Sequence, residues 1–415
     1  MRKSSLFILI IVSCLSIYGK KIEDKEELSF DVIVDSSQFN EGYFERQILR
    51  YEELIKEYQN DLRSLIKRDI EEKERTVNEK YGQVLKREEE KELVSRNDAI
   101  KLFEEFIKKY PDNSKYTPNA MYRLAELYYE RSVIDYGEKY SRYEELQEQY
   151  DKKLVKSEPV EPALDFSDTT ELYESLIKRF PDFQYIGSVY YMLGYCYAES
   201  GNGDKAVKVW LDLIEKKIET THLAELYMRL GDHYFETNVL DKAEHFYKEG
   251  MRFTESDFFD KLLYKYAWTF YRVSRFEEAV NSFTQLLFFA DDMKSKGINR
   301  GQDLRKEAVQ YIAISFSDDE WGSVEKAIEY FDKIKAASFE KEVFEQIGKY
   351  YFENNNFDQA EKAYRYILQK HPYYESAPRI HYRLIQLYNK SRDFDKVAKE
   401  TEIFAKLYDA SGEWA

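Results

Sequence analysis

This sequence has few residues that interrupt helices or form covalent cross-links. Its 415 residues include 15 glycines, 7 prolines and 2 cysteines. The scarcity of helix breakers favours an all-helical fold. Cys14 lies in an apolar leader, so we do not expect it to form a disulfide with Cys196. Cys196 lies between two tyrosines of a predicted helix, where a small buried side chain is expected.

An excess of positive charge is also missing. Lysine and arginine number 63 against 79 aspartates and glutamates, which gives a formal net charge of −16. Binding to phosphate backbones needs a basic face, and no basic stripe follows the first three residues. Nucleic acid is therefore not an expected partner.

The side-chain patterns that carry catalysis or bind metal are absent as well. No His-x-x-x-His pair, Cys-x-x-Cys pair or Gly-x-Ser-x-Gly elbow occurs. Gly201–Gly203 looks like a phosphate loop, but neither a strand nor Gly-Lys-Ser/Thr accompanies it, and we interpret it as a turn between helices. The carboxylate pairs Asp291–Asp292 and Asp318–Asp319 are expected in loops. We predict no catalytic residue, no metal site, no cofactor and no enzymatic activity.

Aromatic residues are abundant. They make up 16% of the chain, and tyrosine alone contributes 37 residues. A tyrosine ring packs in a core while its hydroxyl reaches the surface, which suits stacked helices with many charges outside. The apolar content also excludes disorder of the whole chain.

The first residues have the pattern of an export leader. Met1-Arg2-Lys3 precedes the apolar run Leu6–Val12, and the whole apolar stretch is only about a dozen residues long. A membrane-spanning helix needs about 20 apolar residues, so residues 1–19 are predicted to be a signal peptide. Residues 20–42 show no periodicity and are interpreted as a tether.

The end of the leader, Ile11-Val12-Ser13-Cys14, resembles the lipobox of bacterial lipoproteins. The resemblance implies that Cys14 receives lipid and anchors the protein to a membrane. Two alternatives stay open. Cleavage after Gly19 would give a soluble exported protein, and an uncleaved leader would itself be the anchor.

Residues 43–95 are predicted to form a long amphipathic helix. Its apolar residues recur at steps of four and three, which is a seam of period 3.5. Such a seam either joins chains in a coiled coil, giving a homo-oligomer through residues 43–70, or folds back on the following helices. The seam consists of Phe44, Ile48, Tyr51, Ile55, Tyr58, Leu62 and Leu65.

From residue 96 a helix–turn–helix unit recurs, seen most clearly in Tyr190–Leu213. A small residue in each second helix marks the repeat, and most of these marks lie 33 to 37 residues apart. Longer steps of 70 and 48 residues indicate two insertions. The marks are Ala99, Thr169, Ala206, Ala243, Ala279, Ala327, Ala360 and Val397.

The unit resembles the tetratricopeptide repeat. Leu193-Gly194 with Tyr197, and Ala206 with Trp210, match the signatures of its first and second helices, and other units repeat them. The resemblance implies a right-handed α-solenoid of about seven to eight helix pairs, preceded by the long N-terminal helix. It divides the chain into first repeat units at 96–185 and a repeat array at 186–411.

The insertions and the end of the chain depart from the regular repeat. We predict an overlong first helix that reaches about Lys153, followed by a loop at 156–168 with two prolines. A polar loop is predicted at Asp291–Asp303. Residues 412–415 follow the last helix without a capping helix, so either this edge docks on a partner or the sequence is the front portion of a longer protein.

In tetratricopeptide arrays the fifth, ninth and twelfth positions of the first helices line a partner groove. The resemblance implies such a groove here, lined with aromatic residues that suit an extended or helical peptide. The alternative is that the rings pack against the next repeat. Tyr191, Tyr195 and Glu199 replace the lysine and asparagine of a carboxylate clamp, so capture of a C-terminal carboxylate is not expected. The groove candidates are Tyr122, Tyr129, Tyr191, Tyr195, Met228, Phe235, Tyr264, Trp268, Tyr271, Phe352 and Tyr382.

In overall plan the chain resembles tetratricopeptide proteins of the bacterial envelope, including outer-membrane assembly lipoproteins and repeat proteins of motility and secretion machines. This implies a scaffold on the periplasmic side of the envelope, anchored at the outer membrane, with other envelope proteins or peptides as partners. One alternative is an oligomeric periplasmic coordinator of envelope constriction or outer-membrane assembly. Another is the docking or regulatory domain of a longer enzyme.

Overall fold

The computed structural model describes residues 90–334 and 338–409, with seven separate residues between 64 and 88. The chain divides into two compact units, Met1–Leu93 and Val94–Ala415. The predicted signal peptide, Cys14 and the tether lie outside the described residues, as do most of the predicted helix at 43–95 and residues 412–415. The following description concerns the second unit.

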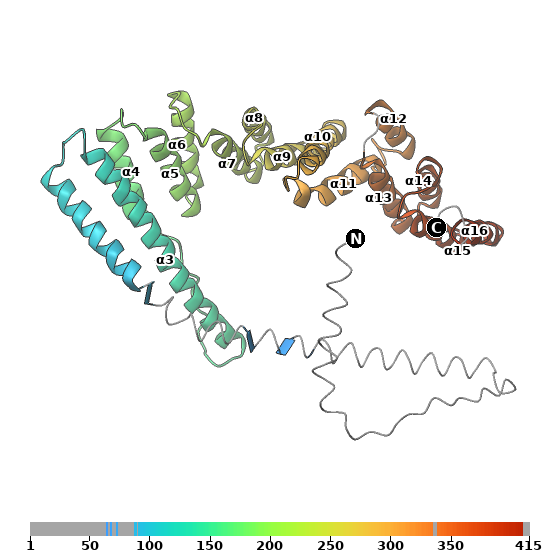
Figure 1. Ribbon diagram of the computed structural model, residues 1–415, viewed down its shortest axis with the longest axis horizontal. Coiled ribbons are helices and arrows are strands. Elements are labelled where there is room, and N and C mark those ends of the chain that lie inside the picture. Colours follow the sequence, from blue (N-terminus) through green and yellow to red (C-terminus); the bar gives the residue numbers. More distant parts are fainter. Residues whose placement is uncertain are drawn as a thin grey trace, which may run out of the picture. The chain divides into compact units, whose positions relative to one another are not determined.

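Every regular element in the described part of the chain is a helix, which confirms the predicted fold class. A helix at 90–109 is followed by seven helix pairs (Figure 1). They are α3 (Thr117–Asp151) with α4 (Ser167–Arg179), α5 (Ile186–Glu199) with α6 (Gly203–Glu215), α7 (Leu223–Glu236) with α8 (Leu240–Gly250), α9 (Phe259–Arg272) with α10 (Phe276–Ser295), α11 (Gln302–Phe316) with α12 (Val324–Ile334), α13 (Glu340–Glu353) with α14 (Phe357–Lys370), and α15 (Ala377–Lys390) with α16 (Phe394–Leu407).

In three of the pairs, a glycine of the first helix meets an aromatic ring of the second. A Cβ added to Gly194 of α5 would lie 2.2 Å from Nε1 of Trp210 in α6. That indole nitrogen donates a hydrogen bond to the Tyr191 carbonyl at 3.1 Å, so the ring spans the crossing and is satisfied there. Gly231 meets Tyr247, and Gly348 meets Tyr364, in the same way.

The small residues that mark the second helices lie at the centre of this packing. Ala243, Ala279, Ala327 and Ala360 are fully buried, and Ala206 is 1% exposed. A larger side chain at these points would push the helices apart, because protein interiors are close-packed. The repeat spacing read from the sequence is therefore the spacing of helix crossings.

The turns inside five of the pairs share one backbone geometry. The second residue after the first helix is left-handed, and the next amide donates to a carbonyl five residues earlier, which satisfies helix-end carbonyls. For α7, Val239 N donates to Tyr234 O at 2.7 Å. The left-handed residues are Gly201, Asn238, Ser274, Asn355 and Arg392, with φ between 57° and 74°.

Neighbouring pairs share their apolar faces, as expected for repeats that cannot bury a core alone. The buried residues form a large cluster from Leu263 to Tyr388 and a second from Met121 to Phe246. A small third cluster lies between them along the chain and contains Met228, Ala243, Tyr247 and Leu262.

The first inserted segment contains a helix of 35 residues, α3, which Figure 1 shows continuing far beyond α4. Its buried residues all lie between Thr117 and Ala125, so the rest of the helix carries little of the core. A loop at 152–166 leads back to α4, and Phe166 at its end stacks on Tyr129 with ring centroids 4.9 Å apart.

The second inserted segment differs from the prediction of a polar loop. Helix α10 continues through Asp291 and Asp292 to Ser295, and Gly297 follows with a φ of 77°. The carboxylate pair Asp291–Asp292 therefore lies on a helix and not in a loop. Asp291 pairs with Arg305 of α11 at 2.6 Å, and this ion pair joins the polar end of α10 to the next helix.

No helix in the described part of the chain is both long and apolar enough to cross a membrane.

Candidate binding face of the repeat array

Four of the predicted groove residues line one cavity of about 580 Å³ between the α7–α8 pair and α9. We call it the aromatic cavity. Phe235 of α7 and Tyr264, Trp268 and Tyr271 of α9 were predicted from their repeat positions, and Tyr247 of α8 adds a fifth ring. Two cations, Lys265 and Arg272, complete the lining.

The rings of the aromatic cavity are held from behind by α11. The Tyr311 ring lies 4.3 Å from the Trp268 ring and 4.9 Å from the Tyr271 ring, centroid to centroid. Trp268 also contacts Tyr271 at 5.4 Å and Tyr264 at 6.2 Å, each edge to face. Edge-to-face aromatic pairs fix ring orientation, so the cavity wall is formed before any partner arrives.

The two cations of the aromatic cavity differ in their surroundings. Lys265 pairs with Asp232 at 2.8 Å, and Asp232 also accepts a hydrogen bond from the Tyr247 hydroxyl at 2.7 Å. Arg272 lies over the Phe235 ring at 4.8 Å and approaches the Phe235 carbonyl at 3.4 Å. No carboxylate of the described residues pairs with Arg272.

Several other groove candidates pack against the next repeat, which is the alternative that the sequence left open. Tyr191 is only 5% exposed and stacks on His222 at 4.3 Å, and Met228 is 9% exposed. Tyr195 lies under the guanidinium of Arg229 at 4.5 Å. These side chains contribute little open surface.

The candidates at the two ends of the array are dispersed. Tyr122 stacks on Tyr185 at 5.8 Å, and Tyr129 stacks on Phe166. Phe352 lies under Lys390 at 4.4 Å, and Tyr382 is 53% exposed. The structure brings none of these four into the aromatic cavity.

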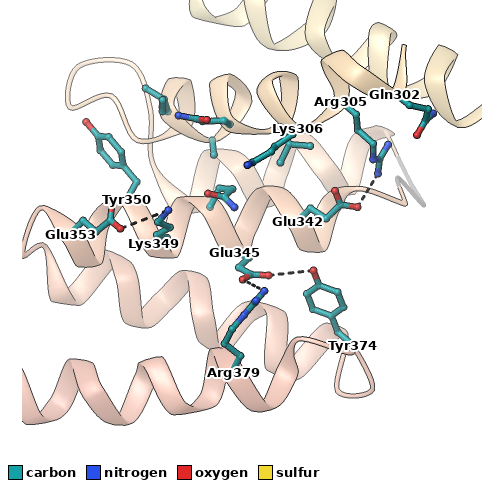
Figure 2. A pocket seen from close by; sticks show the side chains of 15 residues that line it. Gln302, Arg305, Lys306, Glu342, Glu345, Lys349, Tyr350, Glu353, Tyr374 and Arg379 are labelled. Carbon is teal, nitrogen blue, oxygen red and sulfur yellow. Dashed lines mark hydrogen bonds and ion pairs between the residues drawn. The ribbon is translucent and has the colours of Figure 1, made fainter. Parts of the chain in front are cut away.

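A second cavity, of about 560 Å³, lies on the same first-helix face farther along the chain and is charged. Figure 2 shows side chains of α11, α13 and the start of α15 around it. Arg305 bonds Glu342 at 2.8 Å, and Arg379 bonds Glu345 at 2.7 Å. Both pairs join successive repeats, and the second does so through a largely buried residue, because Glu345 is 6% exposed.

Lys306 also lines this charged cavity, and no carboxylate of the described residues pairs with it. The charged cavity was not predicted from the sequence, because only apolar side chains were considered at the groove positions. Glu345 and Lys349 of α13 stand at the same repeat positions as Tyr191 and Tyr195 of α5, and both line the cavity. The repeat positions alone would therefore have identified these two residues as groove candidates.

The tyrosines of the binding face are neutral hydrogen-bonding groups at physiological pH. Burial raises the pKa of Tyr129 to about 12, with the neighbouring Tyr195 as a further cause. Burial also raises the pKa of Tyr271, and it raises that of Tyr264 together with a hydrogen bond to Glu307. Their hydroxyls therefore offer recognition and no acid–base chemistry near neutral pH.

The described residues contain no group of three histidine, cysteine or carboxylate side chains that could hold a metal ion. Cys196 is a free, fully buried thiol, as its position between two tyrosines predicted.

Comparisons with known proteins agree with the helix-pair geometry. Sequence profiles of the tetratricopeptide repeat match residues 188–216 and 346–399. No curated protein matches the chain.

Among solved structures, the chain is similar to the C-terminal part of a tetratricopeptide repeat-containing protein from Cytophaga hutchinsonii. The identity is 16% and the TM-score 0.37, over 69% of this chain and 94% of that chain. It is also similar to a tetratricopeptide repeat protein from Parabacteroides merdae, at 13% identity and a TM-score of 0.29, over 65% and 94% of the two chains.

Stacked helix pairs with glycine and alanine at their crossings, and cavities on the face of the first helices, define the class of helical repeat proteins that bind other proteins. The matched segments α5–α6 and α13–α16 carry the repeat signature, and the α7–α8 pair between them has the same glycine–ring crossing. The chain is a tetratricopeptide repeat protein.

Proposed function

We propose that the chain is a non-enzymatic scaffold of the bacterial cell envelope, with other envelope proteins or peptides as its partners. The observation that supports binding is the aromatic cavity, where four rings at predicted groove positions surround about 580 Å³. This volume is within the usual range for ligand sites, and its walls are mostly aromatic. Rigid rings provide contact area at a small entropy cost.

Site-specific photocrosslinking in the native host tests the binding role. A photoreactive residue at Tyr271 lies in the aromatic cavity, and one at Lys306 lies in the charged cavity. Lys248, exposed on α8 and outside both cavities, is the matched control. We expect a defined partner band from a cavity position and none from Lys248. Equal labelling at all three positions would contradict a scaffold that binds through the first-helix face.

The envelope location is supported by the N-terminal leader. A basic start, the apolar run Leu6–Val12 and Cys14 together fit export with lipid attachment at the outer membrane. Mass spectrometry of the mature N-terminus tests this proposal. A lipidated Cys14 is expected, an unmodified start at Lys20 removes the anchor, and an intact leader on a cytoplasmic chain removes export itself.

The apolar seam at residues 43–70 supports a homo-oligomer as part of the same proposal. Light scattering on the purified protein gives its mass in solution. A mass that falls to one chain when Ile48 and Ile55 are replaced by serine supports association through this seam. A monomer before any substitution would contradict the oligomer and leave the binding face unaffected.

A further inference from the structure

Arg272 differs from the other arginines that lie over aromatic rings. Eight arginines of the described residues lie over a ring, and seven of them also pair with a carboxylate of the described residues at 4.0 Å or less. Arg272 is the exception in this part of the chain. The paired arginines are Arg123, Arg131, Arg179, Arg229, Arg275, Arg300 and Arg365.

Arg229, one repeat earlier, shows what is missing at Arg272. Its guanidinium lies 4.5 Å from the Tyr195 ring centroid, and it pairs with Glu225 at 3.0 Å and with Glu199 at 3.4 Å. Arg272 has the same ring contact without the carboxylates. In a chain with a net charge of −16, an uncompensated guanidinium at a cavity rim is a local site for negative charge.

The position of Arg272 couples this charge to the aromatic cavity. Its guanidinium lies over Phe235, which lines the cavity together with Trp268 and Tyr271. The neighbouring cation, Lys265, is already paired with Asp232. One planar, oriented donor is therefore available at the rim, and the guanidinium fork matches the two oxygens of a carboxylate.

We infer that the aromatic cavity binds an acidic peptide segment of a partner protein, in which a large apolar side chain is flanked by carboxylates. The apolar side chain enters between Trp268, Tyr271 and Phe235, and a flanking carboxylate pairs with Arg272. The inference rests on the proposed scaffold function and names the class of partner segment. A basic segment is disfavoured because its cations would face Arg272, which no carboxylate of the described residues neutralises.

Short synthetic peptides and the purified full-length chain test the inference. The first peptide has one tryptophan flanked on both sides by aspartates. In the second peptide asparagines replace the aspartates, in the third lysines replace them, and in the fourth alanine replaces the tryptophan. Isothermal titration calorimetry at low and moderate salt measures each dissociation constant.

The acidic tryptophan peptide is expected to bind most tightly and to weaken as salt is raised, because the charged pair lies at an exposed rim. Arg272→Gln should weaken its binding by about threefold to tenfold, which is the range for an exposed to half-exposed charge-assisted pair. The salt dependence should fall with it. Arg229→Gln is the matched control and should change binding by less than about twofold, because Arg229 is already neutralised.

The inference is overturned if the aspartate and asparagine peptides bind the wild-type chain equally well, or if Arg272→Gln leaves the acidic peptide bound as before. Equal binding of the alanine peptide would show that the rings do not take the apolar side chain. Circular dichroism of each variant confirms its fold. A partner crosslinked at Tyr271 together with a failed acidic peptide would retain the scaffold and reject this partner class, whereas equal labelling at Tyr271, Lys306 and Lys248 would reject the scaffold itself.

Discussion

Glycine at a helix crossing is a constraint that no other residue satisfies. In the pair α5–α6 the Trp210 indole occupies the space where a Cβ of residue 194 would lie. The ring is 2% exposed and its nitrogen is hydrogen-bonded, so it cannot move aside without losing both contacts. A single methyl group at this point therefore tests whether the crossing holds the repeat together.

Gly194→Ala is expected to lower the local free energy of unfolding by about 1–3 kcal/mol, the usual cost of overpacking a core. Hydrogen exchange of α5 and α6 measures the loss. Gly137→Ala is the matched control, because no atom lies within 4 Å of its added Cβ and alanine is favoured over glycine within a helix. A Gly194→Ala protein as protected as the wild type would contradict the packing role.

The Cys196 thiol is the clearest case of a side chain made unreactive by its surroundings. It is fully buried, and burial raises its pKa from an ordinary 9.0 to about 12. The thiolate is the reactive form, and its fraction at neutral pH falls as the pKa rises.

In a Cys14→Ser chain, where Cys196 is the remaining cysteine, alkylation by iodoacetamide at neutral pH is expected to be slow. We expect a rate at least on the order of a hundredfold below that of the same chain in urea, because both access and thiolate fraction are reduced. Intact-mass spectrometry over time measures this. Similar rates in the two conditions would show that the site opens readily.

At the scale of single elements, α16 is held by polar contacts more than by apolar burial. Its one buried residue is Glu400. The Glu400 carboxylate accepts hydrogen bonds from Arg365 of α14 at 2.8 Å and from His381 of α15 at 2.9 Å. Burial acts to raise the pKa of Glu400, but these bonds outweigh it and hold the pKa below its ordinary value of 4.5.

The depressed pKa predicts how α16 responds to acid. A group whose pKa is lowered in the folded state stabilises it fully above the unfolded value and loses that contribution as pH falls through the folded value. Protection of α16 should therefore decline below about pH 4.5. Hydrogen exchange of α16 at neutral and acidic pH measures the decline.

Glu400→Gln should reduce the stability of α16 by about 1–3 kcal/mol at neutral pH and flatten its acid response, because a hydrogen-bonded charge is removed. Glu402→Gln, on the same helix, is the control and should leave the protection unchanged. Glu402 pairs with Lys406, four residues on, and both side chains are exposed. An acid response that persists in Glu400→Gln would assign it to another group.

The distal part of α3 is expected to contribute little to stability. Its buried residues end at Ala125, and beyond them Tyr129 stacks on Phe166 and Arg131 pairs with Asp168 of α4 at 2.7 Å. Replacing residues 134–163 by a short glycine–serine linker should change the thermal midpoint by no more than a few degrees. Circular dichroism measures the midpoint, and a loss of cooperative unfolding would contradict this prediction.

The helix crossings could be predicted from the sequence, because only small side chains fit there. Ala206, Ala243 and Ala279 mark them by their regular spacing. The predicted loop was wrong at Asp291–Ser295, because the polar side chains of this segment were taken to indicate a loop. The positive φ of Gly297 places the helix end later, and the polar Asp291 pairs with Arg305 of the next helix. The unpaired state of Arg272 could not be predicted, because it depends on which carboxylates lie near it in space.

At the scale of the whole repeat array, the hydrophobic core is divided into clusters. The cluster from Leu263 to Tyr388 and the cluster from Met121 to Phe246 are connected along the chain by the small group around Tyr247 and Leu262. Repeat proteins gain stability from each pair and its neighbours, so the division of the core between two large clusters predicts two cooperative blocks.

Ile347→Ala is expected to lower the stability of the second block by about 2–5 kcal/mol, because Ile347 is fully buried in the larger cluster. Hydrogen exchange should show lost protection in α11–α14 with α5 and α6 unchanged. The converse substitution, Leu230→Ala, should affect the first block, since Leu230 belongs to the other cluster. Equal losses across both blocks would show a single cooperative unit.

The shared geometry of the turns after α5, α7, α9, α13 and α15 has a consequence for the history of such a chain. Each turn is closed by the same backbone hydrogen bonds and a left-handed residue, whether that residue is glycine, asparagine, serine or arginine. The junction is set by the backbone more than by the side chain. A helix pair can therefore be duplicated or lost between two such junctions without new turn chemistry, and the length of the array is free to vary among descendants.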